Sequence, residues 1–140
     1  MGADLEGAEL FEARLEDANL AGAHLSDAEL KQAYLMSARL EGAELMSADL
    51  EGAHLEYADL SHTRLYSAYL ARADLAYANL SDAHLNSAHL EGADLRYANY
   101  LTQEQVNSAH GDETTQLPPG IIEPESWKKK PTPTPPTHSN

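Results

Sequence analysis

The sequence predicts a solenoid, a chain wound into stacked coils, and three observations lead to this fold class. Every fifth residue from Leu5 to Leu95 is leucine. The residue two places before each of these leucines is alanine, except at Thr63. Residues five apart lie about 140° apart around an α-helix and alternate between the faces of a flat strand, so neither element fits. Each five-residue unit, or pentad, is expected to form one short straight side and then bend, with its leucine and alanine pointing inward.

The pentads resemble the repeats of a known family. Runs such as Ala18–Gly22, Ala48–Gly52 and Ala93–Tyr97 are similar to those of the pentapeptide-repeat family, over residues 1–100 in twenty consecutive pentads. The resemblance implies an all-β solenoid, specifically a right-handed quadrilateral β-helix with four pentads to a coil. Twenty pentads then make about five coils, and at the strand spacing of about 4.8 Å the rod is about 24 Å long.

Residues twenty apart are expected to stack in this geometry, so the leucines form internal ladders. Each buried leucine contributes roughly 1.5 to 3 kcal/mol, whereas a side chain larger than alanine at the crowded inward position costs roughly 1 to 3 kcal/mol. Thr63 is expected to satisfy its hydroxyl by bonding to a neighbouring backbone group. Glycine occurs at several bends, where it relaxes the backbone, but polar residues and tyrosine fill other bends.

The repeat stops at Tyr100, and a short capping helix is predicted within residues 101–111. Thr102 and Gln105 fit a capping box, with Leu101 and Val106 as the hydrophobic staple. Gly111 is the expected C-terminal stop. A helix of about eight residues is marginal alone, so we expect it to lie across the open end of the last coil.

The remaining segments are predicted from composition. Residues 112–127 carry the last large apolar groups and are expected to pack as an irregular docked arm, and residues 128–140 are rich in Lys, Pro and Thr and are expected to be a flexible tail. At the other end, the first coil is an exposed sheet edge, which favours a homodimer through that terminal coil.

Composition limits the classes of function. The chain has no cysteine, no signal-peptide pattern and no apolar run long enough to cross a bilayer, so a cytoplasmic protein is the expectation. The family resemblance implies a bacterial one. Its net charge is −14, and the repeats hold 18 acidic and 6 basic residues, which argues against direct binding of nucleic acid. The same charge approaches the linear density of duplex DNA, about one charge per 1.7 Å. The family resemblance implies a related possibility, since its quinolone-resistance members look like DNA mimics that occupy bacterial type II topoisomerases.

Stacking at twenty residues defines two candidate contact surfaces. The candidate acidic contact face consists of Glu9, Glu29, Asp49 and Glu51. A metal-bound carboxylate cluster is one interpretation of it, but like charges in water are more often simply solvated. The candidate aromatic contact column consists of Tyr57, Tyr77 and Tyr97, whose rings either pack against one another for stability or form a protein contact.

No residue pattern predicts catalysis, a cofactor or a metal. The chain offers no cysteine nucleophile and no phosphate-binding glycine loop, its histidines lack regular ligand spacing, and a packed convex rod has no water-excluding pocket. We therefore predict a protein that is not an enzyme and that acts as an interaction or structural scaffold module. The alternative is a DNA mimic that binds DNA gyrase, and a third possibility is a trimmed or idealised array without a dedicated ligand.

Overall fold

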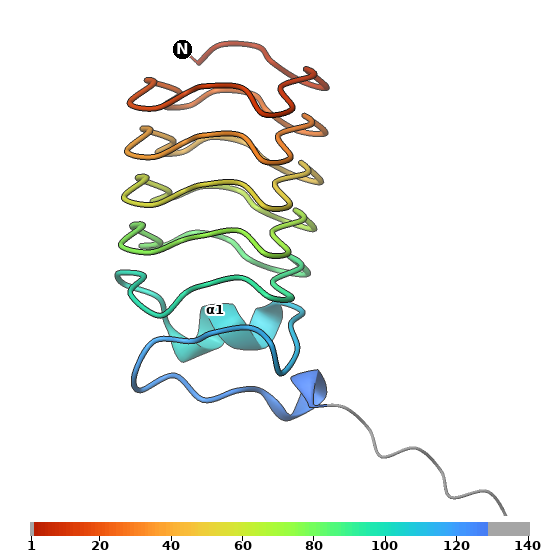
Figure 1. Ribbon diagram of the computed structural model, residues 1–140, viewed down its shortest axis with the longest axis vertical. Coiled ribbons are helices and arrows are strands. Elements are labelled where there is room, and N and C mark those ends of the chain that lie inside the picture. Colours follow the sequence, from red (N-terminus) through yellow and green to blue (C-terminus); the bar gives the residue numbers. More distant parts are fainter. Residues whose placement is uncertain (1, 129–140) are drawn as a thin grey trace, which may run out of the picture.

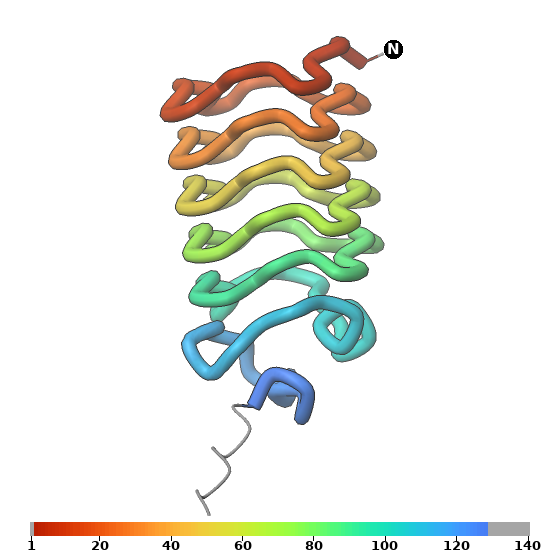
Figure 2. Tube along the Cα trace, turned by 90° about the vertical axis from the view of Figure 1, so that its right-hand side faces the viewer, coloured from red at the N-terminus to blue at the C-terminus, as the bar shows by residue number. Residues whose placement is uncertain are grey.

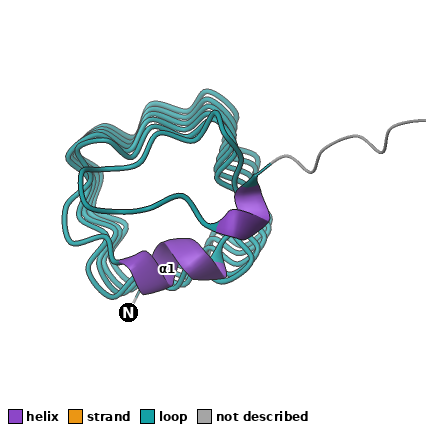
Figure 3. Cartoon of the chain, turned by 90° about the horizontal axis from the view of Figure 1, so that it is seen from below, coloured by secondary structure: helices purple, strands orange, loops and turns teal. Residues whose placement is uncertain are grey.

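The computed structural model describes residues 2–128, which wind into coils of twenty residues stacked along one axis (Figure 1). Residues twenty apart form parallel bridges, from Asp4 with His24 to Asn79 with Asn99. Four columns of bridges run along the rod, and seen along the axis the coils superpose in a four-sided outline (Figure 3). The expected coil of four pentads is therefore present.

Each straight side of the coil is shorter than a regular β-strand. Residues 2–128 contain isolated bridges and no continuous strand, because only one residue of each side, between the alanine and the leucine, pairs in both directions. At one such rung Leu45 N donates to Arg64 O at 2.8 Å, and Arg64 N donates to Ala43 O at 3.0 Å. The all-β prediction thus holds for the bridging pattern but not for regular strands.

The pentads end in tight turns, and from Gly7 to Gly92 the second central residue of each turn is left-handed. Ala48 N donates to Leu45 O at 3.1 Å, and Ser47 between them has φ 59°. A negative φ followed by a positive φ is the pattern of a type II turn, which favours glycine at its second central position. Glycine is used at corners such as Gly42, but serine, tyrosine, aspartate and arginine occupy the same conformation at others.

The interior consists of stacked leucines and alanines. The leucines from Leu25 to Leu95 are almost completely buried, as are the alanines that precede them. Thr63 is also fully buried, and its hydroxyl donates to Leu60 O at 2.7 Å, so the predicted backbone bond is confirmed. Leu5, Leu10 and Leu15 of the first coil are only partly buried.

Helix α1 (Gln103–Ser108) follows the last pentad. The predicted capping box is present, since the Thr102 side chain accepts from Gln105 N and the Gln105 side chain accepts from Thr102 N at 2.8 Å. After α1 the chain resumes the winding (Figure 2), with His110 bridged to His89 and Gln116 bridged to Asp94. The segment expected as an irregular arm thus adds a further rung to the last coil.

Gly111 has a different role from the one predicted. Helix α1 ends at Ser108 with Ala109 as its C-cap, so Gly111 does not terminate it. A Cβ on Gly111 would lie 2.6 Å from the ring of Trp127, which belongs to the short helix η1 (Glu125–Trp127). Trp127 is buried and its Nε1 donates to Ala109 O at 2.9 Å. Glycine is required here because the indole packs directly on the backbone.

The limits of the described chain bear on two expectations. All of the predicted tail except Lys128 lies outside residues 2–128. Within these residues, no helix has the length and apolar character needed to cross a membrane.

Candidate interaction surfaces

The structure brings the predicted acidic contact face together on one side of the rod. Glu9 bridges Glu29, and Glu29 bridges Asp49, so three carboxylates occupy successive rungs. Glu51 follows Asp49 at the adjoining corner, where its N–H donates to Asp49 Oδ1 at 3.1 Å. The predicted column therefore exists as a geometric feature.

Part of this acidic face is neutralised by neighbouring cations. Lys31 Nζ lies 3.6 Å from Asp49 Oδ2, and Arg72 forms an ion pair with Glu51. Phe11, which is exposed, lies with Glu29, Lys31 and Asp49 around a small hollow of about 190 Å³. The sequence reasoning missed these pairings because they join different columns of the rod.

Several acidic residues also have a structural task. Asp49, Asp74 and Asp94 each accept, through a side-chain oxygen, the N–H of the residue two places later, at 3.0 to 3.1 Å. Such Asx turns fix the start of the corner, which is a reason for aspartate at the bridge position apart from any partner. At Asp94 the Arg96 guanidinium also donates to both carboxylate oxygens, and this hydrogen bonding lowers the pKa of Asp94.

The predicted aromatic contact column is confirmed as a stack. The rings of Tyr57 and Tyr77 lie 5.0 Å apart at 10°, and those of Tyr77 and Tyr97 lie 5.3 Å apart at 8°. The three side chains are nevertheless 63%, 46% and 52% exposed, and the Arg96 guanidinium lies over the ring of Tyr97. The rings cover one another's faces and present their edges and hydroxyls to solvent.

Other stacks were not predicted. Tyr34 stacks on His54, with Arg14 over its other face, and Tyr69, His89 and His110 form a second column. The twenty-residue spacing could have found the first and most of the second. His110 lies 21 residues after His89, and its place in the stack depends on the geometry of α1.

One carboxyl group stands out by its environment. Glu56 Oε1 is buried and accepts no hydrogen bond from any group in residues 2–128, and it lies 3.5 Å from His54 Nδ1. Burial, followed by the negative charge of Asp74 in the next coil, raises the pKa of Glu56. The short Ala76 side chain follows Glu56 in the same corner column, twenty residues on.

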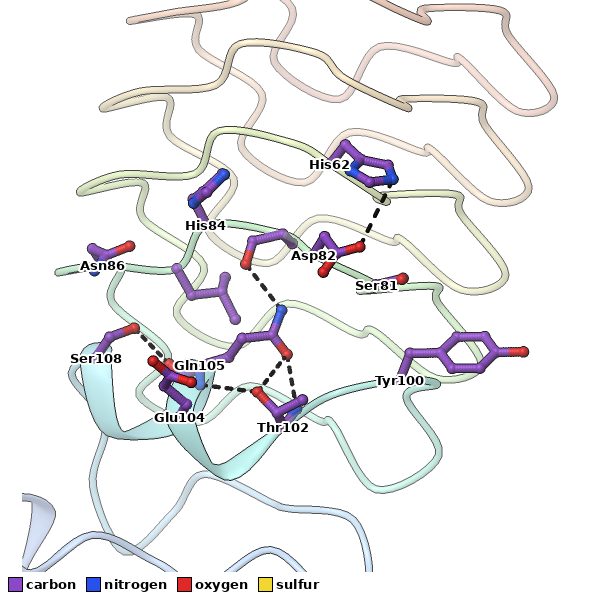
Figure 4. Close-up of a pocket in the computed structure, with 12 residues that line it drawn as sticks. His62, Ser81, Asp82, His84, Asn86, Tyr100, Thr102, Glu104, Gln105 and Ser108 are labelled. Carbon is purple, nitrogen blue, oxygen red and sulfur yellow. Dashed lines mark hydrogen bonds and ion pairs between the residues drawn. The ribbon is translucent and has the colours of Figure 1, made fainter.

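A groove lies where α1 departs from the coil wall (Figure 4). Its volume is about 680 Å³, and it is lined on one side by residues Ser81 to Asn86 of the last coil and on the other by Thr102, Glu104, Gln105 and Ser108. Gln105 crosses it, and its Nε2 donates to Leu80 O at 2.8 Å and to Ala83 O at 2.9 Å. Sequence reasoning had not predicted a groove on a convex rod.

Within residues 2–128, no group of three or more potential ligand side chains is arranged to hold a metal ion. The surface therefore consists of acidic rungs, stacked aromatic rings and one polar groove.

The fold and these surfaces define a pentad solenoid, and comparison with known proteins gives its family. The model of the pentapeptide repeat family matches residues 2–27, 13–52, 43–76 and 73–99, in eight copies. The chain belongs to the pentapeptide repeat family. Comparison with curated protein sequences gives no match.

Solved structures of the family resemble the chain. A pentapeptide repeat protein from the thylakoid lumen of Arabidopsis thaliana is 27% identical with a TM-score of 0.65, over 67% of this chain and 66% of that chain. Rfr23 from the cyanobacterium Cyanothece 51142 is 34% identical with a TM-score of 0.41, over 71% and 64%. QnrB1, a plasmid-mediated fluoroquinolone resistance protein, is 16% identical with a TM-score of 0.37, over 84% and 67%. The chain thus spans just under two thirds of the length of the first two.

Proposed function

We propose that this chain is a non-catalytic interaction module that binds another protein through its outer surface. The observation that carries the proposal is the aromatic contact column of Tyr57, Tyr77 and Tyr97. Tyrosine is enriched at protein interfaces, where its ring supplies contact area and its hydroxyl a hydrogen bond. Three large aromatic side chains at least 46% exposed on successive coils form a continuous strip of this kind.

The turns at this column do not require tyrosine. Tyr57 and Tyr77 have φ values of 62° and 60°, a conformation that costs a non-glycine residue roughly 1–2 kcal/mol. Stacking of the rings stabilises the folded protein by about 0.5–1.5 kcal/mol for each pair. Since Ser37 occupies the same corner in the preceding coil, tyrosine is not needed to form the turn.

The test replaces the column without disturbing the turns. The triple variant Tyr57→Ser, Tyr77→Ser, Tyr97→Ser should fold and keep its circular dichroism, because serine already fills corners of the rod. Used as bait beside the wild type, it should lose the specific partner recovered from lysate of the source cells. The matched control is Tyr66→Ser with Tyr69→Ser, on other sides of the rod, which should retain that partner. Equal recovery by both variants would contradict the proposal.

Three further expectations are part of this proposal. They are a right-handed sense of the quadrilateral β-helix, a bacterial cytoplasmic location, and a homodimer through the first coil. The family supports the handedness, and the partly buried Leu5, Leu10 and Leu15 support self-association. Sedimentation of the 140-residue chain over a range of concentrations tests the dimer.

A second candidate function is a DNA mimic that binds DNA gyrase. The three stacked carboxylates of Glu9, Glu29 and Asp49 favour it, since they repeat a negative charge along the rod. The test is a gyrase supercoiling assay titrated with the protein at two salt concentrations. Mimicry predicts salt-sensitive inhibition that the variant Glu9→Gln, Glu29→Gln, Asp49→Asn abolishes while remaining folded. No effect on supercoiling at high protein concentration would exclude this candidate.

A further inference from the structure

On the side of His84, the last coil leaves two backbone N–H groups without an acceptor in residues 2–128, and both residues line the groove beside α1. In the coil above, His62 N donates to Ser81 O and Leu65 N donates to His84 O, each at 2.9 Å. The donors twenty residues later belong to Asp82 and Leu85. No hydrogen bond from either N–H to another group is present in residues 2–128.

On two other sides of the last coil, the leucine N–H has an acceptor. Ser87 N donates to Ser108 O at 2.8 Å, Leu90 N to His110 O at 2.8 Å, and Leu95 N to Gln116 O at 2.7 Å. The segment that follows the pentads therefore supplies acceptors for the leucine donors of those sides. On the side of His84, α1 lies away from the coil wall. No backbone segment of residues 2–128 accepts hydrogen bonds there from the last coil.

On this side Gln105 provides a donor for the carbonyls of the wall but no acceptor for its N–H groups. In a regular coil Ala83 O would accept from the N–H of a residue on the next coil, just as Thr63 O accepts from His84 N at 2.9 Å. Here the Gln105 amide donates to Ala83 O instead. The carbonyls of the wall are thus satisfied, while its donors face the groove and require oxygen acceptors.

The charged residues that line the groove indicate which charge a ligand should carry. Asp82 and Glu104 are both exposed and lie on opposite walls (Figure 4), and the twelve lining residues include no lysine or arginine. His62 Nε2 lies 3.9 Å from Asp82 Oδ2. Cationic groups at this position would meet two carboxylates.

We propose that this groove binds a peptide segment of a partner protein that carries lysine or arginine. The peptide adds beside residues 82–85 with the bend of a pentad corner, so that two of its carbonyls, three residues apart, accept from Asp82 N and Leu85 N. Residues 81 and 84 present their carbonyls in this way to the coil above them, with Asp82 between them left-handed at φ 55°. The basic side chains then pair with Asp82 and Glu104. Addition of a peptide to an open sheet edge takes its affinity from main-chain bonds.

The first test uses the free protein. Leu85 and Leu65 are both buried in the same ladder, so burial alone predicts equal protection of their amides from hydrogen exchange. Because Leu85 N–H has no acceptor in residues 2–128 and Leu65 N–H has one, the amide of Leu85 should exchange at least about tenfold faster than that of Leu65. Equal protection would mean that an acceptor inside the protein already holds Leu85 N–H, and it would overturn the proposal.

The second test adds a probe peptide, an acetylated and amidated octamer of alternating lysine and valine. Its binding should move the amide proton resonances of Asp82 and Leu85 downfield and slow their exchange. Two probes serve as controls: the same octamer with glutamate for lysine, and spermine, a polycation without carbonyls. Equal shifts with either control, shifts confined to other residues, or no shifts at all at millimolar peptide would overturn the proposal.

Matched variants separate the groove from the general acidity of the rod. Asp82→Asn with Glu104→Gln should weaken binding of the lysine octamer about three- to tenfold, the range for two exposed ion pairs. Asp17→Asn with Glu12→Gln removes two charges far from the groove, at a corner where Asp17 has φ 61° against 55° at Asp82. Equal losses in both variants would contradict a specific site. The groove is separate from the aromatic contact column, so the tyrosine variant should still bind the octamer.

Discussion

At the scale of single residues, the corners show how far the fold tolerates backbone strain. Gly42 has φ 66°, and a Cβ added there would meet no atom within 4 Å. Gly42→Ala should therefore lower the free energy of unfolding by about 1 kcal/mol through the backbone alone. Ser47, exposed with φ 59°, provides the reciprocal change, and Ser47→Gly should raise stability by up to about 1 kcal/mol. Urea unfolding measures both, and changes of equal sign would contradict the strain argument.

The buried carboxyl of Glu56 predicts a dependence of stability on pH. Burial and the charge of Asp74 raise its pKa, so folding favours the protonated form. The stability from this group is complete below the pKa of unfolded glutamate and is lost as the pH rises through the raised pKa of the folded state. Glu56→Gln should therefore stabilise the protein increasingly as the pH rises above about 4, the ordinary pKa of glutamate. Thermal unfolding at several pH values measures this effect.

Glu16, in the same corner column, gives the matched control for this pH dependence. Glu16→Gln removes a carboxylate from the same column, so the difference between the two variants at each pH isolates the effect of the surroundings of Glu56. A constant difference between Glu56→Gln and the wild type would show that Glu56 is not protonated preferentially in the folded protein.

Individual residues differ in how well the sequence predicts their surroundings. The five-residue period with a twenty-residue coil was sufficient to place Thr63, the tyrosine column and the acidic rungs, because these depend only on the stacking of equivalent positions. The contact of Gly111 with Trp127 joins segments that follow no repeat, and the pairing of Lys31 with Asp49 depends on side-chain direction. Neither spacing nor composition predicts contacts of these kinds.

At the scale of elements, Gln105 connects α1 to the coil. Its Oε1 accepts from Thr102 N, and its Nε2 donates to two wall carbonyls. Gln105→Glu retains the acceptor of the capping box but places a carboxylate against the carbonyls of Leu80 and Ala83. The variant should lose about 1–3 kcal/mol, the cost of unpaired buried polar groups. Faster hydrogen exchange confined to the last coil and α1 would verify this, and Glu104→Gln on the exposed face should leave the exchange rates unchanged.

The existence of α1 could be predicted from its capping box, but the groove beside it could not. The box is a local pattern, and it fixes where the helix begins. The groove arises because the helical residues take the place of the next side of the coil, so that His110 pairs with His89 at a separation of 21 residues. The resulting loss of one rung is a property of the whole last coil.

At the scale of the whole molecule, charge opposes the stacking that the leucines drive. Acidic residues occur on all four sides of the rod, and like charges face each other at Glu9 with Glu29, Glu29 with Asp49, and Asp74 with Asp94. Like charges opposite each other across a ladder are destabilising, by amounts on the order of 0.2–1 kcal/mol. Ion pairs such as Arg96 with Asp94 act in the opposite direction. The net charge of −14 indicates that repulsion dominates.

Salt should therefore stabilise the rod. Raising sodium chloride from about 0.02 M to 0.5 M shortens the screening length from roughly 20 Å to roughly 4 Å, below the spacing of adjacent coils. The melting temperature should rise over this range, and the rise should be smaller in Glu29→Gln, which removes the central charge of three. Thermal unfolding by circular dichroism measures both. A melting temperature that falls with salt would mean that the ion pairs between columns, rather than the repulsion along them, determine the electrostatic contribution to stability.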